Sequence, residues 1–227
     1  NDLILVPDGG NQDGTFIEIT EKSALWFRVR TVGKQIHASM PDKGLNAHRA
    51  GMVYALAVDK MLHDKYSAKD PYFEPPESTF EPTKKEKNVD AVNIIPGEDI
   101  IHFDCRILPS YDIEEILKDI KQLAAEYEKK TGAKIEIEPL HKSVAPKPTD
   151  PNSEIVLAMK EAVRNVQGKE SKIGGIGGGT CAAFFRKINI PAVVWSTIDE
   201  IAHQPNEYSK IENMTNDAKI LASLMLS

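Results

Sequence analysis

The sequence predicts an α+β protein in which a compact ferredoxin-like domain is inserted into an incomplete α/β domain. Residues 23–142 read as strand, helix, two strands, helix and strand, which is the ferredoxin-like order. Helices and strands alternate again after residue 150, as they do in an α/β layer. Between these regions, Pro146, Pro148 and Pro151 mark a linker. The α/β domain is therefore expected to consist of residues 1–22 and 143–227.

The first elements are short apolar runs. Residues 3–6 predict a buried strand that stops at the tight turn Pro7-Asp8-Gly9-Gly10. Residues 16–19 and 24–32 continue as strands, the second with polar and apolar side chains interleaved. Asn46 then opens a helix. The residues expected to share its apolar face are Val53, Leu56, Ala57 and Met61.

The middle of the chain predicts a loop and a hairpin. Residues 67–88 are rich in proline, glutamate and lysine, so they are expected to be mainly loop with an extended piece at 78–80. Residues 89–95 and 98–108 flank Pro96-Gly97, which predicts a hairpin. On the second strand, the apolar side chains from 101 to 107 alternate with polar ones. The polar face holds His102, Asp104 and Arg106.

The remaining elements alternate between helices and strands. The clearest helix spans about 112–130 and begins with a capping pattern at Asp112 and Glu115. A strand at 133–139 follows it. Beyond the linker, the pattern predicts a helix over about 153–167, a glycine-rich turn, a short helix over about 180–187, a strand at 191–196 and a final helix over about 209–226.

Composition excludes several functional classes. The 227 residues are 41% hydrophobic and 27% charged, as in an ordinary globular protein, and the net charge of −6 gives no reason to expect nucleic acid as a partner. No apolar run approaches the roughly 20 residues that span a bilayer. Cys105 and Cys181 lie far apart, which favours a reducing cytoplasm over a disulfide framework. We expect a processed or truncated chain, because it begins with Asn1 and shows no secretory signal.

Three residues are candidates for metal binding or catalysis. Asp8 ends a strand beside two glycines, which let other groups approach closely. His203 follows an apolar strand, where the turn exposes its ring nitrogen while the sheet holds its backbone. His37 lies in a segment of small residues after strand 24–32. Each has a plain alternative, an Asx-turn for Asp8 and a solvated side chain for either histidine.

Other residues suit the binding of a carboxylate or an oxyanion. The run of residues 174–179 leads through Thr180 into a helix, and it lacks the lysine of a P-loop and the last glycine of a dinucleotide motif. A carboxylate-binding turn and a plain tight turn both fit. Arg106 suits a carboxylate clamp or a salt bridge with Asp104. Asn93 suits donation to an oxyanion or to the backbone of the hairpin.

Together these segments resemble the zinc-dependent M20-type metallopeptidases, which include acetylornithine deacetylase, succinyl-diaminopimelate desuccinylase, aminoacylase and glutamate carboxypeptidase. The resemblance covers essentially the whole chain, and it depends on the order and spacing of several motifs. They are Pro7–Gly10, Gly33–His37, Asn93 with Ile95–Gly97, Asp104–Arg106, Gly178–Thr180, and His203 with Pro205–Glu207.

The resemblance implies a catalytic domain with two zinc, cobalt or manganese ions and an inserted lid domain, residues 23–142, that forms a homodimer. The reaction implied is cleavage of the amide bond of an N-acyl amino acid or of a peptide's C-terminal residue. Asp8 and His203 match one ligand of each metal ion, and His37 matches a lid residue that stabilises the tetrahedral intermediate across the dimer. The residues that match substrate-binding groups are Asn93, Arg106, Gly178, Gly179 and Thr180.

The chain also departs from this family pattern. No His-x-Asp and no Glu-Glu pair precedes Asp8, and Cys181 stands where many members have aspartate. One protein ligand per ion does not hold zinc, which normally has three or more. We therefore expect the C-terminal portion of a zinc amidohydrolase that is inactive by itself and binds partial or no metal. The alternative is a non-catalytic dimerisation or ligand-binding module.

Overall fold

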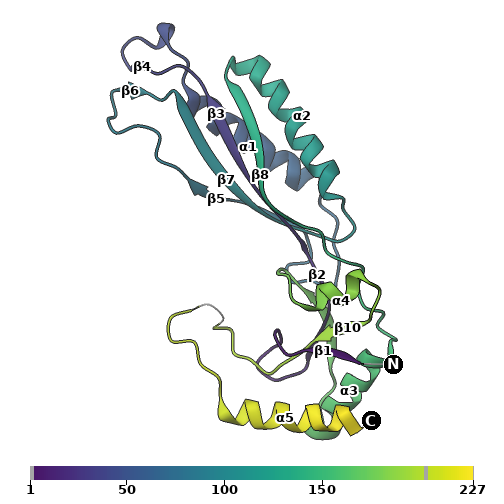
Figure 1. Cartoon of the computed structure of the whole chain (residues 1–227). Helices are drawn as coiled ribbons and strands as arrows, with labels where there is room; N and C mark the ends of the chain where they lie inside the picture. The colour runs from purple at the N-terminus through teal and green to yellow at the C-terminus, as the bar shows by residue number, and fades with distance from the viewer. Residues whose placement is uncertain (1–2, 202–203, 227) are drawn as a thin grey trace. The chain divides into compact units, whose positions relative to one another are not determined.

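The computed structural model describes residues 3–201 and 204–226 (Figure 1). The chain forms two compact units. Unit 1 comprises Asn1–Lys22, Asp70–Pro76 and Ala145–Ser227, and unit 2 comprises Ser23–Lys69 and Glu77–Val144. The segment 70–76 thus packs with unit 1, although the sequence placed it in the inserted domain. None of the helices in the described ranges is long and apolar enough to cross a membrane.

Unit 2 is an antiparallel sheet with two helices and has the ferredoxin-like order that the sequence predicts. Its strands lie in the order β5 (Thr79–Lys85), β7 (Glu98–Ile107), β3 (Ser23–Val32) and β8 (Lys134–Ser143). The helices α1 (Ala47–Lys65) and α2 (Ile113–Thr131) pack on the sheet around one apolar core. Phe27 and Phe103 stack at the centre of this core, with 4.8 Å between their ring centroids.

Helix α2 matches its prediction because its signals are local. The side chain of Asp112 accepts a hydrogen bond from the Glu114 N–H, and Gly132 ends the helix in the left-handed region at φ 76°. The apolar stripe faces the sheet. Its buried members are Ile113, Ile116, Leu117, Ile120 and Ala124.

The predicted apolar face of α1 is only partly correct. Asn46 caps the helix as expected and Met61 packs against the core, but Val53 and Leu56 are 46% and 72% exposed. The residues that α1 buries are Ala47, Ala50, Gly51, Tyr54, Val58 and Leu62. Apolar residues occur on both sides of this helix, so periodicity did not select the buried one. The buried side includes Gly51, where a Cβ would lie 2.7 Å from the Asp99 Oδ2, so only glycine allows this close approach to β7.

The predicted hairpin around Pro96-Gly97 is also wrong. Only β6 (Ile94–Ile95) precedes the turn, and it pairs with β4 (Ile36–His37), whereas β7 pairs with β3 and β5. Strand β5 is longer than the extended piece predicted at 78–80. It accommodates Pro82 because it is an edge strand with a register shift next to that residue. A short 3-10 helix, η1 (Pro41–Lys43), follows β4.

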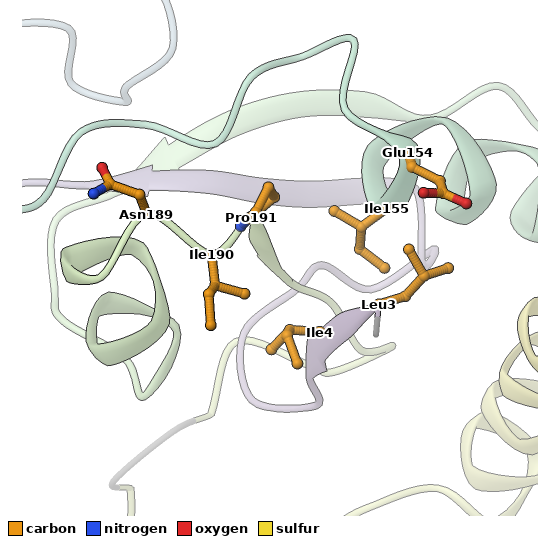
Figure 2. A pocket seen from close by; sticks show the side chains of 7 residues that line it. All are labelled: Leu3, Ile4, Glu154, Ile155, Asn189, Ile190 and Pro191. Carbon is orange, nitrogen blue, oxygen red and sulfur yellow. The ribbon is translucent and has the colours of Figure 1, made fainter. Parts of the chain in front are cut away.

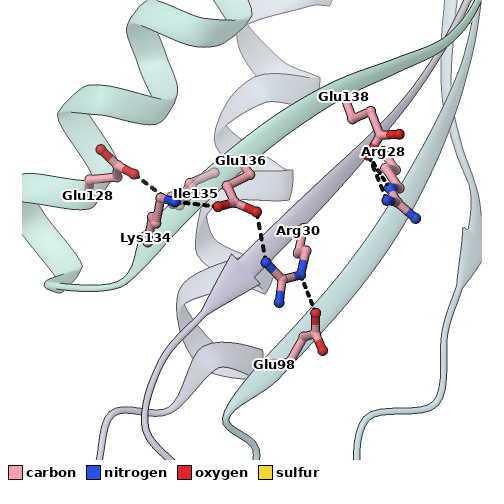
Figure 3. A network of polar contacts seen from close by, with 8 residues as sticks. All are labelled: Arg28, Arg30, Glu98, Glu128, Lys134, Ile135, Glu136 and Glu138. Atoms are coloured by element: carbon pink, nitrogen blue, oxygen red, sulfur yellow. Dashed lines mark hydrogen bonds and ion pairs between the residues drawn. The ribbon is translucent and has the colours of Figure 1, made fainter.

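The face of this sheet away from the helices carries charged side chains in cross-strand pairs (Figure 3). Arg28 contacts Glu138 at 2.6 Å, and Arg30 lies between Glu136, at 2.8 Å, and Glu98. These pairs are partly exposed, so solvent screens them and they contribute little to stability. Their main effect is to specify the register of β8 and β7 on β3.

Unit 1 is a four-stranded mixed sheet in the order β1 (Ile4–Val6), β10 (Ala192–Val194), β2 (Phe16–Glu21) and β9 (Lys172–Ile176). Strand β1 runs parallel to β10, and β2 runs parallel to β9, while β10 and β2 are antiparallel. The helices α3 (Glu154–Gln167) and α5 (Ile211–Leu226) share one core with the sheet. The short helix α4 (Ala182–Lys187) packs in a second, smaller core.

Two segments of unit 1 are more ordered than the sequence predicted. Gly174 and Gly175 belong to strand β9, which pairs with β2, rather than to a turn. Glycine is needed at both positions because a Cβ on either would lie within 2.5 Å of an aromatic ring. The proline-rich linker is fixed at Thr149, which is buried. Its Oγ1 donates to the Ala192 carbonyl at 2.6 Å, and its N–H donates to the Ile19 carbonyl at 2.9 Å.

Candidate functional site

In unit 1, Asp8 is held at the carboxyl end of β1 next to the end of β10. Its N–H donates to the Val6 carbonyl at 3.0 Å, and the Ser196 hydroxyl donates to the carbonyls of Asp8 and Gly9. A Cβ on Gly10 would lie 1.8 Å from the Ser196 oxygen, so only glycine fits there. The turn therefore directs an exposed carboxylate from the end of the sheet.

Asp8 lines a pocket of about 250 Å³ with the segment that follows β10. The other lining residues are Thr197, Ile198, Asp199, Ile201, Glu207, Tyr208, Ser209, Lys210 and Asn213. His203 lies outside the described residues, but Ile201 and Glu207, on either side of it in the sequence, both line the pocket of Asp8. The ends of this segment are tied together by Lys210 Nζ and Asp199, 2.9 Å apart, which lowers the pKa of Asp199.

The described residues do not form a metal site by themselves. Within 3–201 and 204–226, no group of three or more His, Cys, Asp or Glu side chains is arranged to hold a metal ion. Asp8 is an oxygen donor, and the Asp199 carboxylate is already paired with Lys210. Asp8 therefore supports one ligand position, and the described carboxylates do not complete a zinc centre, which normally has three or more protein ligands.

A buried ion pair lies beneath the Asp8 turn. Arg186 on α4 contacts Glu18 on β2, with Nη1 and Oε1 3.1 Å apart and both side chains at most 1% exposed. The guanidinium also donates to the carbonyls of Ala192 and Glu18. Burial raises the pKa of Glu18 to about 7, even though Arg186 opposes this shift. The Glu18 Oε2 would lie 3.7 Å from a Cβ on Gly9, which places this carboxylate under the turn.

The glycine turn before α4 already holds a carboxylate from its own chain. The Thr180 N–H donates to the Glu21 Oε2 at 3.0 Å. Burial raises the pKa of Glu21, and the hydrogen bond from Thr180 opposes that shift. A Cβ on Gly178 or Gly179 would meet nothing within 4 Å, so the turn is open on that side. The turn thus has the chemistry of a carboxylate site, with Glu21 as its present partner.

In unit 2, the structure brings His37 and Asn93 together. Strands β4 and β6 pair His37 with Ile94, and the Ala38 N–H donates to the Asn93 carbonyl at 2.8 Å. The base of this two-stranded ribbon is braced by backbone hydrogen bonds from Gly33 to Gly97 and from Ala47 to Pro96. The His37 ring is exposed, and its Nδ1 contacts Ser39.

Asp99 is a buried carboxylate that the sequence analysis did not single out. Its carboxylate is fully buried at the start of β7 and accepts hydrogen bonds from His48 at 3.0 Å, from Asn88 at 2.8 Å and from Lys85. These donors come from α1, the end of β5 and the segment that leads to β6. Asp99 thereby ties these parts to the sheet. An acid in the strand-opening pattern Glu98-Asp99-Ile100 was the available signal.

The sequence suggested either a carboxylate clamp or a salt bridge with Asp104 for Arg106, and the structure shows the salt bridge. The Arg106 Nε and Nη2 contact both carboxylate oxygens of Asp104 at 2.6 and 2.9 Å, and the guanidinium lies 6.0 Å from the centroid of the Trp26 ring. His102 and Asp104 form a His-x-Asp sequence on β7, but His102 contacts Glu86 at 2.7 Å while Asp104 holds Arg106.

A second pocket in unit 1, of about 340 Å³, lies at the edge strand β1 (Figure 2). Its lining is mainly aliphatic and comes from β1, the start of α3 and the turn before β10. The residues are Leu3, Ile4, Glu154, Ile155, Asn189, Ile190 and Pro191. Glu154 is its one ionisable group, and none of the predicted site residues lines it, so it does not share the chemistry around Asp8.

Comparison with known proteins decides the family. The model of the M20 peptidase dimerisation domain matches residues 19–132. The chain belongs to the M20 peptidase family. This confirms the resemblance and the mixed α/β fold expected from the motifs.

M20 relatives extend the likeness beyond the matched domain. An uncharacterised metallohydrolase of Methanocaldococcus jannaschii is 40% identical over 99% of this chain and 57% of its own length. A succinyl-diaminopimelate desuccinylase of Nitratiruptor is 24% identical over 93% of this chain and 55% of its own length. The solved tripeptidase of Staphylococcus aureus has a TM-score of 0.77 at 20% identity, covering 98% of this chain and 56% of that one. The chain thus spans little more than half the length of these relatives.

The M20 match separates the candidate residues into two groups. His37, Asn93 and Arg106 lie inside the matched range, together with the ribbon and the salt bridge that hold them. Asp8, the glycine turn and His203 lie outside it, in unit 1. Sequence reasoning missed Glu18 and Arg186 because they are 168 residues apart and neither belongs to a motif.

Proposed function

We propose that this chain is part of a dinuclear zinc amidohydrolase or peptidase, of the deacylase, desuccinylase or carboxypeptidase type. Its substrate is an N-acyl amino acid or a peptide with a free C-terminal carboxylate. The observation that carries the proposal is the pocket that Asp8 shares with residues on both sides of position 203. Membership of the M20 family and relatives called metallohydrolase and desuccinylase support it.

Each unit has a role in this proposal. Unit 1 belongs to the catalytic domain, which the sequence assigns to residues 1–22 and 143–227. Unit 2 belongs to the lid that forms the homodimer, which the sequence assigns to residues 23–142. Asp8 and His203 each supply one ligand to a pair of zinc, cobalt or manganese ions, whose other ligands come from outside this chain. The chain by itself is therefore inactive and binds partial or no metal. The described cysteines are both unpaired, which supports a cytoplasmic location.

The chain's own residues would act on the two ends of the substrate. His37 and Asn93 donate hydrogen bonds to the oxyanion that forms when the amide carbonyl is attacked. Arg106 in unit 2 and the turn Gly178–Thr180 in unit 1 are each candidates to bind the substrate carboxylate. At the Thr180 N–H the substrate would take the place of Glu21, and at Arg106 it would share the guanidinium with Asp104.

The test is a chimera in which this chain replaces the segment that it matches in the Methanocaldococcus jannaschii metallohydrolase. We expect the chimera to bind two zinc ions and to hydrolyse some members of a panel of N-acetyl amino acids, N-succinyl amino acids and short peptides. The isolated chain should do neither. Amidating the substrate's carboxylate should abolish turnover, and Asp8→Ala should remove at least one zinc ion.

Two outcomes contradict the proposal. Turnover with stoichiometric zinc by the isolated chain refutes its inactivity. A folded, zinc-loaded chimera that hydrolyses nothing in the panel, while the parent metallohydrolase remains active on it, favours the alternative of a non-catalytic dimerisation or ligand-binding module.

The homodimer has a candidate surface on α1. Met52, Val53 and Leu56 are 43%, 46% and 72% exposed on the helix face that does not contact the sheet of unit 2. Apolar side chains grouped in this way on a helix are typical of an interface. The matched dimerisation domain contains all three.

Replacing Leu56 with aspartate should raise the dissociation constant of the dimer at least about 100-fold, because a charge would be buried without a partner. Sedimentation velocity at micromolar concentration should show a dimer for the unmodified chain and a monomer for this variant. Leu157→Asp, at an exposed leucine of α3 in unit 1, is the matched control and should remain a dimer. A wild-type monomer at this concentration contradicts the assignment.

A further inference from the structure

The exposed ring of His37 is fixed by a turn of its own chain. The Met40 N–H donates to the His37 carbonyl at 2.9 Å, which closes a four-residue turn over residues 37–40. Within that turn the Ser39 N–H donates to the His37 Nδ1 at 3.2 Å. The Ser39 Oγ lies 2.8 Å from the same nitrogen. The His37 Nδ1 therefore contacts both the N–H and the Oγ of Ser39, whereas Nε2 contacts neither group.

These contacts determine where a neutral ring carries its proton. A backbone N–H is only a donor, so Nδ1 must be the acceptor and cannot carry a hydrogen of its own. The position of the ring proton follows from this partner. In the neutral ring the proton is on Nε2. The opposite tautomer would set the Nδ1–H against the Ser39 N–H, donor to donor.

We propose that Ser39 is a positioning residue that holds neutral His37 in the Nε2–H tautomer. The proposal rests on the proposed function, in which His37 donates a hydrogen bond to a developing oxyanion. Only the Nε2–H tautomer presents a donor on the side of the ring away from Ser39. The other tautomer would present a lone pair there, which repels the negative charge.

The surrounding backbone keeps this geometry in place. The Ala38 N–H, between His37 and Ser39, is bonded to the Asn93 carbonyl across the ribbon, and Gly33 and Gly97 close its base. The ring, the turn and Asn93 are thus parts of one hydrogen-bonded ribbon. The pre-organised donor costs little reorganisation when charge develops.

The chain contains a second histidine that serves as an internal reference. The His63 Nδ1 lies 2.9 Å from the Asp59 carbonyl oxygen, which can only accept. His63 must therefore donate from Nδ1, and its neutral ring is the Nδ1–H tautomer. The two histidines should have opposite tautomers in the same sample.

The experiment is long-range ¹H–¹⁵N correlation of the histidine rings in this chain at pH 8.5, with His37 and His63 assigned by His→Gln variants. His37 should show the Nε2–H pattern and His63 the Nδ1–H pattern. Ser39→Thr keeps both donors and should leave the His37 pattern unchanged. Ser39→Pro removes the N–H and should convert His37 to a mixture of tautomers, while amide shifts in β3 and β8 remain those of the unmodified chain.

A His37 ring that is Nδ1–H or mixed in the unmodified chain overturns the proposal, as does a pure Nε2–H pattern in Ser39→Pro. If Ser39→Pro also shifts the β3 and β8 amides, the Ser39→Ala variant, which retains the backbone N–H, is measured in its place. Loss of the Nε2–H pattern in Ser39→Ala overturns the claim that the Ser39 N–H sets the tautomer. None of these readouts needs enzyme activity. An Nε2–H ring in a chimera that hydrolyses nothing would refute the proposed function and leave this inference intact.

Discussion

Replacing Arg186 with methionine should lower the free energy of unfolding of unit 1 by about 3–5 kcal/mol at pH 8. Among the described residues, Arg186 is the only cation that forms an ion pair with Glu18, and the substitution removes it. The substitution also leaves the carbonyls of Ala192 and Glu18 without the hydrogen bonds that Arg186 donates. Urea unfolding followed by the fluorescence of Trp195, a buried residue of unit 1, measures the change. A Trp26→Phe background removes the other tryptophan, which lies in unit 2.

The loss should depend on pH because of Glu18. Burial raises the pKa of this carboxyl from 4.5 to about 7, so the folded state holds the proton more tightly than the unfolded chain. Stability from this group is fully present below pH 4.5 and is lost as the pH rises through about 7. The cost of Arg186→Met should therefore be smaller at pH 5 than at pH 8.

The matched control for this pair is the double variant Glu18→Gln, Arg186→Met, which removes the buried charge together with its partner. It should regain most of the stability lost at pH 8 and show a weaker dependence on pH. Equal costs at pH 5 and pH 8 for the single variant would show that Glu18 does not carry the charge that Arg186 compensates.

In the active chimera, replacing His37 with alanine should reduce kcat about 100- to 1000-fold, equivalent to about 3–4 kcal/mol, with a smaller change in KM. The reason is that the proposed hydrogen bond is made to charge that exists only in the transition state. Steady-state kinetics on the best substrate of the panel measures both constants. Zinc content and dimerisation should not change.

The matched control is His63→Ala, at a histidine of the same unit that lies on α1 and contacts Asp59. It should retain the full kcat. A His37→Ala variant with a raised KM and an unchanged kcat would assign His37 to substrate binding rather than to stabilisation of the transition state.

The elements that the sequence predicts well are those with local signals. Asp112 and Gly132 mark the ends of α2, and its apolar stripe has a clear helical period. The alternation in β7 likewise identifies the buried and polar faces of that strand. Helix α1 lacks such a signal. Its exposed Leu56 is as apolar as its buried Leu62, so the packing of the whole helix against the sheet decides which side is buried, including the close approach of Gly51 to Asp99.

The candidate site shows the same division. The motifs around Asp8, His37, Asn93 and Arg106 are short and keep their order, so sequence alone identified them and the M20 family. Their partners could not be identified in this way. The Thr180 N–H bonds Glu21, and Arg186 pairs with Glu18, across separations of 159 and 168 residues.

By itself, the sequence determined the order of the elements in unit 2 and the family, and it proposed the residues of the candidate site. Only the tertiary structure decided that Ile94–Ile95 pairs with Ile36–His37, that Asp99 holds Asn88 from the segment before β6, and which carboxylate each donor holds. The physical reason is that helix caps and side-chain periodicity arise between neighbours in the chain. Strand pairing and buried ion pairs instead arise between distant segments, where chain closure and desolvation select one partner among many.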